Sequence, residues 1–442
     1  MSAVSLLRRL LGRPRSGIAP RTRQLVQLCQ ALLGEGGEVS GMATARQALA
    51  AYHALDERER EQFFDVLSED FSPSPEAVGK AADAYRDDPT PHNLIRLQQV
   101  VEPPRQELFR RLNMAAGGTA ALVEMRRLVL RGLAAHPAWK VIDADLLHLF
   151  RSWFNRGFLR LERIDWHTPA IVLEKLIRYE AVHAIQGWRD LRRRLEADRR
   201  CFAFFHPQLP EEPIIFIEVA LTRGMSAQVQ PLLDVGAPVF PPEQADCAMF
   251  YSITNCQEGL RGISFGNLLI KQVVEDLKRE FPHLKTFATL SPIPGFRKWL
   301  AEPDTRVRLA MGRDGEARIA LLAQIHTPGW HLHEVPESLQ KMLMRLCAWY
   351  LLHAKRGTEP YDAVARFHLE NGAALERLNW LSDTSEAGMA RSAGLMVNYV
   401  YRLEDVERNH QRYFAAHEVV ASRAVEKLAR KCVLALDKPG EG

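Results

Sequence analysis

The chain has 442 residues, more than one ordinary hydrophobic core accommodates, so its length favours two domains. Apolar residues make up 47% and charged residues 25% of the sequence, a composition typical of soluble globular proteins. The 58 basic and 54 acidic side chains leave a net charge of +4, which is too balanced for a dedicated nucleic-acid-binding protein. No apolar run is long enough for a transmembrane helix, so neither a nucleic acid nor a membrane is expected as a partner.

Cysteine spacing and the basic start of the chain bear on its compartment. Six cysteines are scattered and form no CxxC pair, which argues against a zinc site or a disulfide framework and favours a reducing compartment. The first 34 residues contain six arginines and no acid, as in a mitochondrial presequence or in a basic segment before a first helix. The Ala-, Leu- and Arg-rich composition favours the second interpretation. We therefore expect a bacterial cytoplasmic protein rather than one of the mitochondrial matrix.

Residues 22 to about 155 carry apolar side chains at helical spacing. Leu25, Val26, Leu28, Leu32 and Leu33 form the first stripe, and similar stripes follow as far as Phe154. Short Pro- and Ser-rich segments, such as 72–75, separate the stripes. This pattern predicts an all-α N-terminal helical bundle over residues 1–156, whose apolar stripes make it a candidate for oligomerisation.

The character of the sequence changes near Gly157. Alternating or continuous apolar runs predict strands over residues 158–164, 201–205, 214–221, 248–253, 285–290 and 397–403. Helical patterns occupy residues 267–279, 339–353, 362–378 and 406–429. The order of these elements predicts an α+β domain spanning residues 157–442.

A glycine-containing loop joins the strand near residue 250 to the helix that follows. Gly262 and Gly266 let the backbone approach a ligand closely, and the free N–H groups at the helix start suit a pyrophosphate. Arg261 adds positive charge. The loop resembles motif A of GNAT-type acyltransferases, which holds the pyrophosphate of coenzyme A (CoA), although Ser264 stands where that pattern has its middle glycine. Taken alone, the loop fits a simple turn before a packing helix equally well.

Longer segments downstream point to one family. Residues 290–300 read Leu-Ser-Pro-Ile-Pro-Gly-Phe-Arg-Lys-Trp-Leu, and residues 367–373 read Phe-His-Leu-Glu-Asn-Gly-Ala. Together with residues 259–274, 281–284 and 394–401, these segments resemble the sequences of the malonyl-CoA decarboxylase family. The resemblance runs from about residue 146 to residue 403. It implies a helical N-terminal domain followed by a GNAT-like catalytic domain, and a homotetramer as the probable assembly of the family.

The resemblance also implies the reaction and the site. The expected reaction converts malonyl-CoA to acetyl-CoA and CO2 through an enolate, without a metal or another cofactor, because the thioester carbonyl is itself the electron sink. His368 would donate the proton and Ser291 would orient the substrate, with Tyr401 in the same pocket. The expected CoA-binding loop consists of Arg261, Gly262, Ile263, Ser264, Phe265, Gly266 and Asn267. Without the resemblance, Ser291 reads as a turn residue and His368 as a core histidine.

Several alternatives remain open from the sequence. A GNAT-type acyltransferase and a catalytically silent CoA-binding protein are the rival functions. The arginines between Arg189 and Arg200 could meet the CoA 3′-phosphate or an acidic partner, but a solvated basic helix face is the preferred interpretation. His326, His331, His333 and Glu334 lie close in sequence, but their spacing fits no standard metal site.

Overall fold

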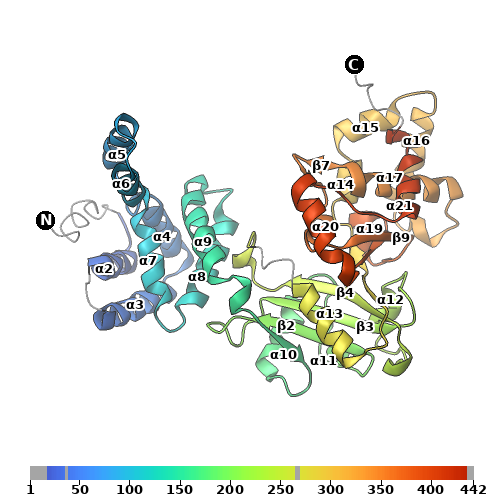
Figure 1. The fold of residues 1–442 in the computed structure, drawn as a ribbon, viewed down its shortest axis with the longest axis horizontal. Helices are drawn as coiled ribbons and strands as arrows, with labels where there is room; N and C mark the ends of the chain where they lie inside the picture. Colours follow the sequence, from blue (N-terminus) through green and yellow to red (C-terminus); the bar gives the residue numbers. More distant parts are fainter. Residues whose placement is uncertain (1–16, 35–37, 264–268, 436–442) are drawn as a thin grey trace. The chain divides into compact units, whose positions relative to one another are not determined.

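The computed structural model describes residues 17–34, 38–263 and 269–435, which form two compact units (Figure 1). The first, here called the helical unit, contains the described residues of Met1–Arg160, His206–Glu212 and Gln257–Ser264. The second, the sheet unit, contains those of Leu161–Phe205, Pro213–Cys256 and Phe265–Gly442. Two short segments from within the predicted second domain thus pack with the helices. Residues 1–16 of the basic leading segment, with four of its six arginines, lie outside the described residues.

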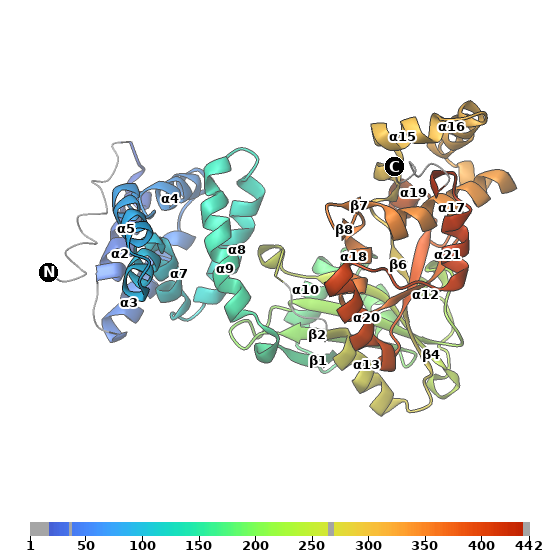
Figure 2. The same ribbon diagram turned by 45° about the horizontal axis from the view of Figure 1, so that its top comes forward.

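The helical unit is built on buried apolar stripes. Its helices are α2 (Pro20–Gly34), α3 (Glu38–His53), α4 (Glu57–Glu69), α5 (Pro75–Asp87), α6 (Pro91–Val101), α7 (Pro104–Asn113), α8 (Gly118–Gly132) and α9 (Lys140–Trp153). Asp56 and Glu59 form a capping box that fixes the start of α4. Phe63, Phe64 and Phe150 are almost fully buried, and α8 and α9 lie side by side (Figure 2).

The sheet unit is organised around one mixed sheet. Its strands are β1 (Arg160–Ile164), β2 (Arg199–Phe205), β3 (Ile215–Thr222), β4 (Cys247–Asn255), β5 (Thr286–Thr289), β6 (Ser291–Pro292), β9 (Ala374–Asn379) and β10 (Met396–Val400). They follow the order β1-β2-β3-β4-β5-β10-β6, with β9 also paired to β10. A separate two-stranded ladder joins β7 (Lys355–Arg356) and β8 (Glu359–Pro360).

The central strands separate at one point of this sheet. β4 and β5 are parallel and paired from Cys247↔Thr286 to Phe250↔Thr289. Beyond Phe250, β4 continues to Asn255, whereas the chain after Thr289 stays with β10 through the pair Val397↔Ser291. The two neighbours therefore diverge, which opens space between them.

Helices surround the sheet and connect its strands. They are α10 (Ala170–Tyr179), α11 (Trp188–Arg194), α12 (Gln230–Leu233), α13 (Leu269–Glu280), α14 (Phe296–Leu300), α15 (Pro303–Ala310), α16 (Gly315–Ala323), α17 (Glu337–His353), α18 (Ala363–Glu370), α19 (Glu386–Ser392), α20 (Leu403–Ala416) and α21 (Arg423–Arg430). Figure 1 shows α13, in yellow, lying along the sheet. The helices of the N-terminal part and the mixed sheet with its helices confirm the predicted fold class, an all-α part followed by an α+β domain. β4, α13 and β5 have the predicted strand–loop–helix–strand order, with β4 and β5 parallel.

Two predicted helices are wrong in part. Residues 362–378 form α18 and then strand β9, because Gly372 takes a φ of +76° that ends the helix, and β9 then pairs with β10. Residues 406–429 form two helices, α20 and α21, separated at His417, which takes a φ of +48°. Helical periodicity did not reveal either break, since each depends on one residue in the left-handed region.

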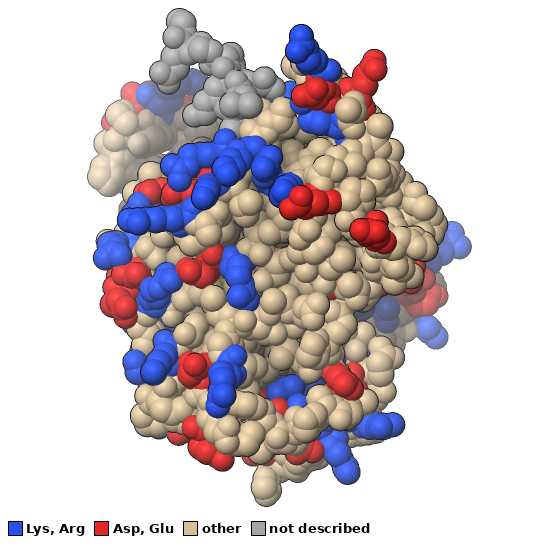
Figure 3. All heavy atoms as spheres, turned by 90° about the vertical axis from the view of Figure 1, so that its right-hand side faces the viewer, with Lys and Arg blue, Asp and Glu red and all other residues tan. Residues whose placement is uncertain are grey.

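The interpretation of the arginine cluster as a solvated helix face holds for the exposed Arg189 and Arg192 but is wrong for the other four arginines, which are buried. Arg193 forms an ion pair with Asp198 at 2.6 Å, and Arg194 pairs with Asp190 and with the fully buried Glu218. Arg199 and Arg200 are buried in pairs with Asp198 and Glu280. The charge is therefore mostly internal and compensated. On the face drawn in Figure 3, basic and acidic side chains are likewise interspersed.

Candidate active site

A cavity of about 260 Å³ lies in the sheet unit where β4 and β5 diverge. Its walls come from β4, from the turn after β5 and from α18. Apolar side chains dominate the lining, and Phe250 and Phe367 are among them. The polar groups at the wall belong to Ser252, Asn255, Ser291 and His368. An apolar cavity with a few converging polar groups is the usual form of a small-molecule site.

Ser291 is held at this cavity by the short strand β6. The strand pairs Ser291 with Val397 and Pro292 with Met396 of β10, and only 5% of Ser291 is exposed. The Ser291 Oγ lies 2.8 Å from the Nε2 atom of His368 and donates to the Thr289 Oγ1 at 2.8 Å. The serine and histidine predicted from distant segments therefore meet directly.

His368 comes from the last turn of α18 and is buried. Burial lowers the pKa of this imidazole to about 3, because the charged form loses its hydration. The ring is therefore neutral at pH 7 in the empty site. The position of His368 near the C-terminus of α18 favours the protonated imidazole, because the helix dipole is negative at that end. A negative charge that enters the cavity would favour the same protonated form.

Two tyrosines of the same chain segment hold the imidazole. The Tyr401 hydroxyl lies 2.8 Å from His368 Nδ1, and burial raises the pKa of this phenol well above its usual value. The Tyr399 ring stacks on the imidazole with a centroid separation of 4.5 Å and an interplanar angle of 27°. Both nitrogens and the plane of the ring are therefore fixed.

Asp362 connects the serine turn to the histidine helix. One carboxylate oxygen accepts the N–H groups of Val364 and Ala365 and caps α18, and the other accepts from Gly295 N at 3.2 Å and the Tyr350 hydroxyl at 3.2 Å. A Cβ atom at Gly295 would stand 2.3 Å from the Tyr350 hydroxyl oxygen, so only glycine fits here. This single side chain joins the two segments that carry Ser291 and His368.

One wall of the cavity is backed by a buried carboxylate. Glu180 accepts hydrogen bonds from the Ser252 hydroxyl at 2.8 Å and from the Thr254 hydroxyl at 3.1 Å. It also accepts from the backbone N–H groups of Val182 and His183. Ser252 thus directs its proton away from the cavity and offers lone pairs to a ligand.

The predicted CoA loop is described only in its first part. Arg261 is exposed, Gly262 takes a φ of +80° that requires glycine, and Ile263 is buried. Ser264, Phe265, Gly266 and Asn267 lie outside the described residues.

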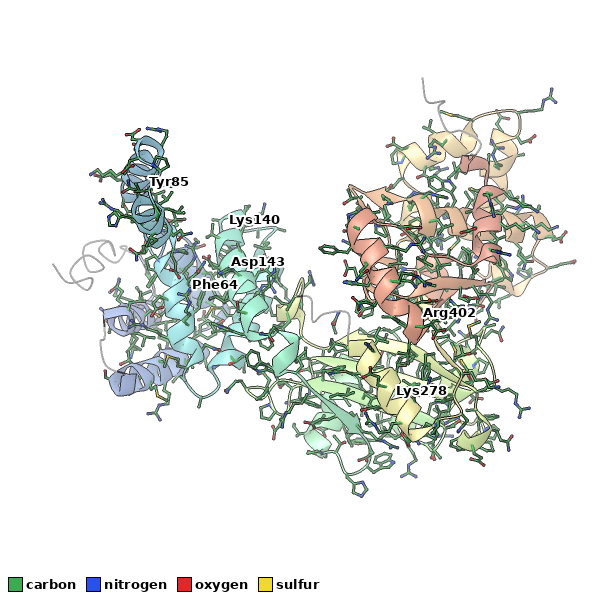
Figure 4. All side chains as sticks on the ribbon, viewed as in Figure 1. Phe64, Tyr85, Lys140, Asp143, Lys278 and Arg402 are labelled. Carbon is green, nitrogen blue, oxygen red and sulfur yellow. The ribbon has the colours of Figure 1, made fainter. Side chains whose placement is uncertain are left out.

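The described part of this loop is attached to the helical unit. The buried Arg126 of α8 donates to the carbonyl oxygens of Gly259 and Arg261, each at 2.8 Å. Its Nε atom pairs with Asp143 of α9 at 2.8 Å, and Asp143 is labelled in Figure 4. A Cβ atom at Gly259 would lie 2.0 Å from the Val123 oxygen, so the loop backbone is in close contact with α8.

The sequence missed three residues that shape the site. Asp362 carried a local signal, since an aspartate directly before a helical pattern is a typical N-cap. Thr289 and Tyr399 carried none, because their contacts join strands that are distant in sequence. For the histidines near residue 330, no group of three or more His, Cys, Asp or Glu is placed to hold a metal ion within the described ranges.

Comparison with known proteins identifies the family. The profile of the malonyl-CoA decarboxylase C-terminal domain matches residues 157–437, and that of the malonyl-CoA decarboxylase N-terminal domain matches residues 71–154. The chain belongs to the malonyl-CoA decarboxylase family. The family predicted from the sequence is thereby confirmed, and with it the expectation of a carboxy-lyase.

Individual members support this assignment. The mitochondrial malonyl-CoA decarboxylase of Anser anser anser is 38% identical over 353 residues, which cover 75% of this chain and 70% of that protein. The crystal structure of malonyl-CoA decarboxylase from Rhodopseudomonas palustris has a TM-score of 0.87 at 50% identity, covering 92% of this chain and 99% of that one. The enzyme from Agrobacterium vitis gives a TM-score of 0.84 at 47% identity with the same coverage.

Proposed function

We propose that Ser291 and His368 form the catalytic centre at which this carboxy-lyase converts malonyl-CoA into acetyl-CoA and CO2. The observation that carries the proposal is the 2.8 Å contact between Ser291 Oγ and His368 Nε2 at the wall of an apolar cavity. A buried imidazole facing such a cavity is suited to proton transfer, since its pKa responds strongly to an incoming charge.

The chemistry requires little beyond orientation and one proton. Breaking the bond between the malonyl carboxylate and the α-carbon releases CO2 and leaves an electron pair delocalised as the thioester enolate. Protonation of the α-carbon then gives acetyl-CoA, so each turnover consumes one proton. The thioester carbonyl accepts the electron pair, and the proposed mechanism therefore uses no metal or other cofactor.

His368 supplies this proton in the proposed mechanism. Its burial disfavours the imidazolium in the empty site, but a malonyl carboxylate in the same cavity stabilises that form by attraction. The imidazolium then donates to the α-carbon after CO2 has left and returns to the neutral state. Ser291, beside the donor, orients the malonyl carboxylate or the thioester oxygen. No Gly-x-Ser-x-Gly elbow surrounds Ser291, so we do not assign it as an acyl-enzyme nucleophile.

The loop from Arg261 to Asn267 is our proposed binding site for the CoA pyrophosphate. Support comes from the left-handed Gly262, which exposes backbone to a ligand, and from the Arg126 contacts that fix the loop. We further propose that the substrate is malonyl-CoA, that the chain assembles as a homotetramer, and that the enzyme works in the bacterial cytoplasm. Within the described residues no helix is long and apolar enough to cross a membrane.

The deciding experiment measures CO2 and acetyl-CoA formed from malonyl-CoA without an amine acceptor. We expect turnover by the wild type and a loss of about 100-fold or more in kcat for His368→Asn and Ser291→Ala. His167→Asn and Ser152→Ala are matched controls, since both residues are exposed and neither lines the cavity. Binding of CoA without turnover would favour a silent CoA-binding protein, and turnover only with an added amine would favour an acyltransferase.

A further inference from the structure

The direction of the hydrogen bonds around Ser291 decides which nitrogen of His368 carries a proton. The Ser291 hydroxyl has one proton and two polar neighbours, Thr289 Oγ1 and His368 Nε2, each at 2.8 Å. If the proton points to Thr289, the serine oxygen can only accept from His368, and Nε2 is then the protonated nitrogen. If the proton points to Nε2, the ring proton must lie on Nδ1.

Thr289 is built as a fixed acceptor for this proton. It ends strand β5, is fully buried, and its Oγ1 also accepts the backbone N–H of Tyr399 at 3.2 Å. Its carbonyl oxygen accepts from the Asn398 side chain at 2.7 Å, which pins the residue to β10. The first of these contacts holds the Thr289 side chain and the second holds its backbone, and χ1 rotation is restricted in a β-branched residue. The Thr289 oxygen therefore remains in place beside Ser291.

The opposite side of the imidazole agrees with this direction. Tyr401 keeps its proton, because burial raises the pKa of the phenol well above its usual value. A phenol is a good donor, and the Nδ1 atom of His368 lies 2.8 Å away. Donation from Tyr401 to Nδ1 leaves the single proton of the neutral ring on Nε2.

We propose that Thr289 is a positioning residue that accepts the Ser291 hydroxyl proton and so keeps the ring proton of neutral His368 on Nε2, beside the cavity. The proposal rests on the catalytic roles of Ser291 and His368 given above. When malonyl-CoA enters, Ser291 turns its proton from Thr289 to a substrate oxygen, and Nε2 keeps its own. Thr289 thus prevents Ser291 from donating to the nitrogen that must deliver a proton to carbon.

Nuclear magnetic resonance of the substrate-free enzyme tests this directly. Ring-15N-labelled histidine distinguishes the two neutral tautomers, and the spectrum of His368→Asn identifies which of the 15 histidines is His368. We expect Nε2–H in the wild type and in Thr289→Ser, which keeps the hydroxyl. We expect Nδ1–H in Thr289→Val, where Ser291 has lost its acceptor and donates to Nε2, and the Tyr401 hydroxyl turns to accept from Nδ1. A wild-type Nδ1–H tautomer, or an unchanged tautomer in Thr289→Val, would overturn the proposal.

Kinetics supply a second readout. In Thr289→Val we expect kcat to fall about 10- to 100-fold while KM changes little, and Thr289→Ser to restore kcat. Thr286→Val is the matched control, because Thr286 lies on the same strand away from the cavity. Both valine and alanine leave the Tyr399 N–H without the Thr289 hydroxyl as its acceptor. The smaller Thr289→Ala serves if Thr289→Val does not fold, with the same expected changes. A wild type without decarboxylase activity would count against the proposed function, whereas the tautomer measurement would still decide the role of Thr289.

Discussion

His368, the residue that we propose as the proton donor, lies in an unfavourable place for a charge. His368 is completely enclosed, its ring is stacked on Tyr399, and its two nitrogens face Ser291 and Tyr401. A histidine in such a place resists protonation until a counter-charge arrives. The carboxylate of the proposed substrate, malonyl-CoA, supplies that counter-charge. The imidazolium of His368 is therefore formed only when malonyl-CoA is bound and can yield the enolate that receives the proton.

This burial predicts a specific dependence of stability on pH. The folded-state pKa of His368 is about 3, below the ordinary 6.5, so the unfolded chain binds a proton that the folded chain does not. The contribution of His368 to stability is therefore complete above pH 6.5 and is lost as pH falls from 6.5 towards 3. Between pH 7 and pH 5, we expect the wild type to lose about 2 kcal/mol more than His368→Asn.

Denaturant unfolding at the two pH values measures this difference. Comparing each protein with itself across pH cancels the cost of the substitution, and His167→Asn controls for removal of an exposed histidine. Equal pH dependence in the wild type and His368→Asn would show that His368 is not held neutral by its surroundings.

Among the secondary-structure elements, one helix cap joins the two segments that carry the proposed catalytic pair. Asp362 caps α18 and also accepts the Gly295 N–H in the turn that follows Ser291. In Asp362→Ala we expect a loss of stability of about 1 to 3 kcal/mol, because the cap and a buried acceptor disappear together. We also expect a fall of at least tenfold in kcat, because the segments bearing Ser291 and His368 lose their common anchor.

The matched control is Ser74→Ala. Ser74 caps α5 in the helical unit, so its loss should lower stability with kcat unchanged. Thermal unfolding and steady-state kinetics on the same preparations separate the two effects. Full activity in folded Asp362→Ala would show that the helix and the turn are held together by other contacts.

The α5–α6 hairpin is the element that we expect to mediate assembly. Within the described ranges α6 contributes no buried residue, and its side chains Leu94, Ile95 and Val101 are 38%, 53% and 46% exposed. Exposed apolar groups at helical spacing are typical of a subunit contact. Tyr85, labelled in Figure 4, lies on the neighbouring α5.

Sedimentation of the full chain tests this expectation. Ile95→Glu places a charge in the apolar stripe and should shift the oligomer to a smaller species, whereas Arg96→Glu, on the next residue of the same helix, should change it little. An unchanged sedimentation coefficient for Ile95→Glu would assign the contact to another surface.

At the scale of the whole molecule, the helical unit holds a loop that is encoded between two elements of the sheet unit. Residues 257–263 pack with the helices through Arg126, although β4 precedes them and α13 follows. The helices therefore support the proposed CoA loop as well as forming a core of their own. The KM for malonyl-CoA should respond to substitutions in α8 that touch neither Ser291 nor His368.

Arg126→Met is the corresponding prediction. Loss of the contacts to the Gly259 and Arg261 carbonyls should raise KM about tenfold, with a smaller effect on kcat, because the loop is displaced while the catalytic pair is untouched. Arg110→Met is the control, since Arg110 forms its ion pairs with Glu102 and Glu107 and not with the loop. An unchanged KM in Arg126→Met would contradict the role of the helical unit in holding the loop.

The local and compositional features of this protein could be predicted from the amino-acid sequence. The spacing of apolar residues located the helices of the N-terminal part and most strands, because each element is encoded by neighbouring residues. Longer sequence motifs, such as the segment around Ser291, identified the family. Three features came from the three-dimensional structure: the internal ion pairs of Arg193 and Arg194, the strand over residues 374–379, and the contacts of Thr289, Tyr399 and Asp362 around the proposed catalytic pair. These features depend on partners distant in the chain, and hydrogen bonds and burial of that kind leave no periodic pattern in the sequence.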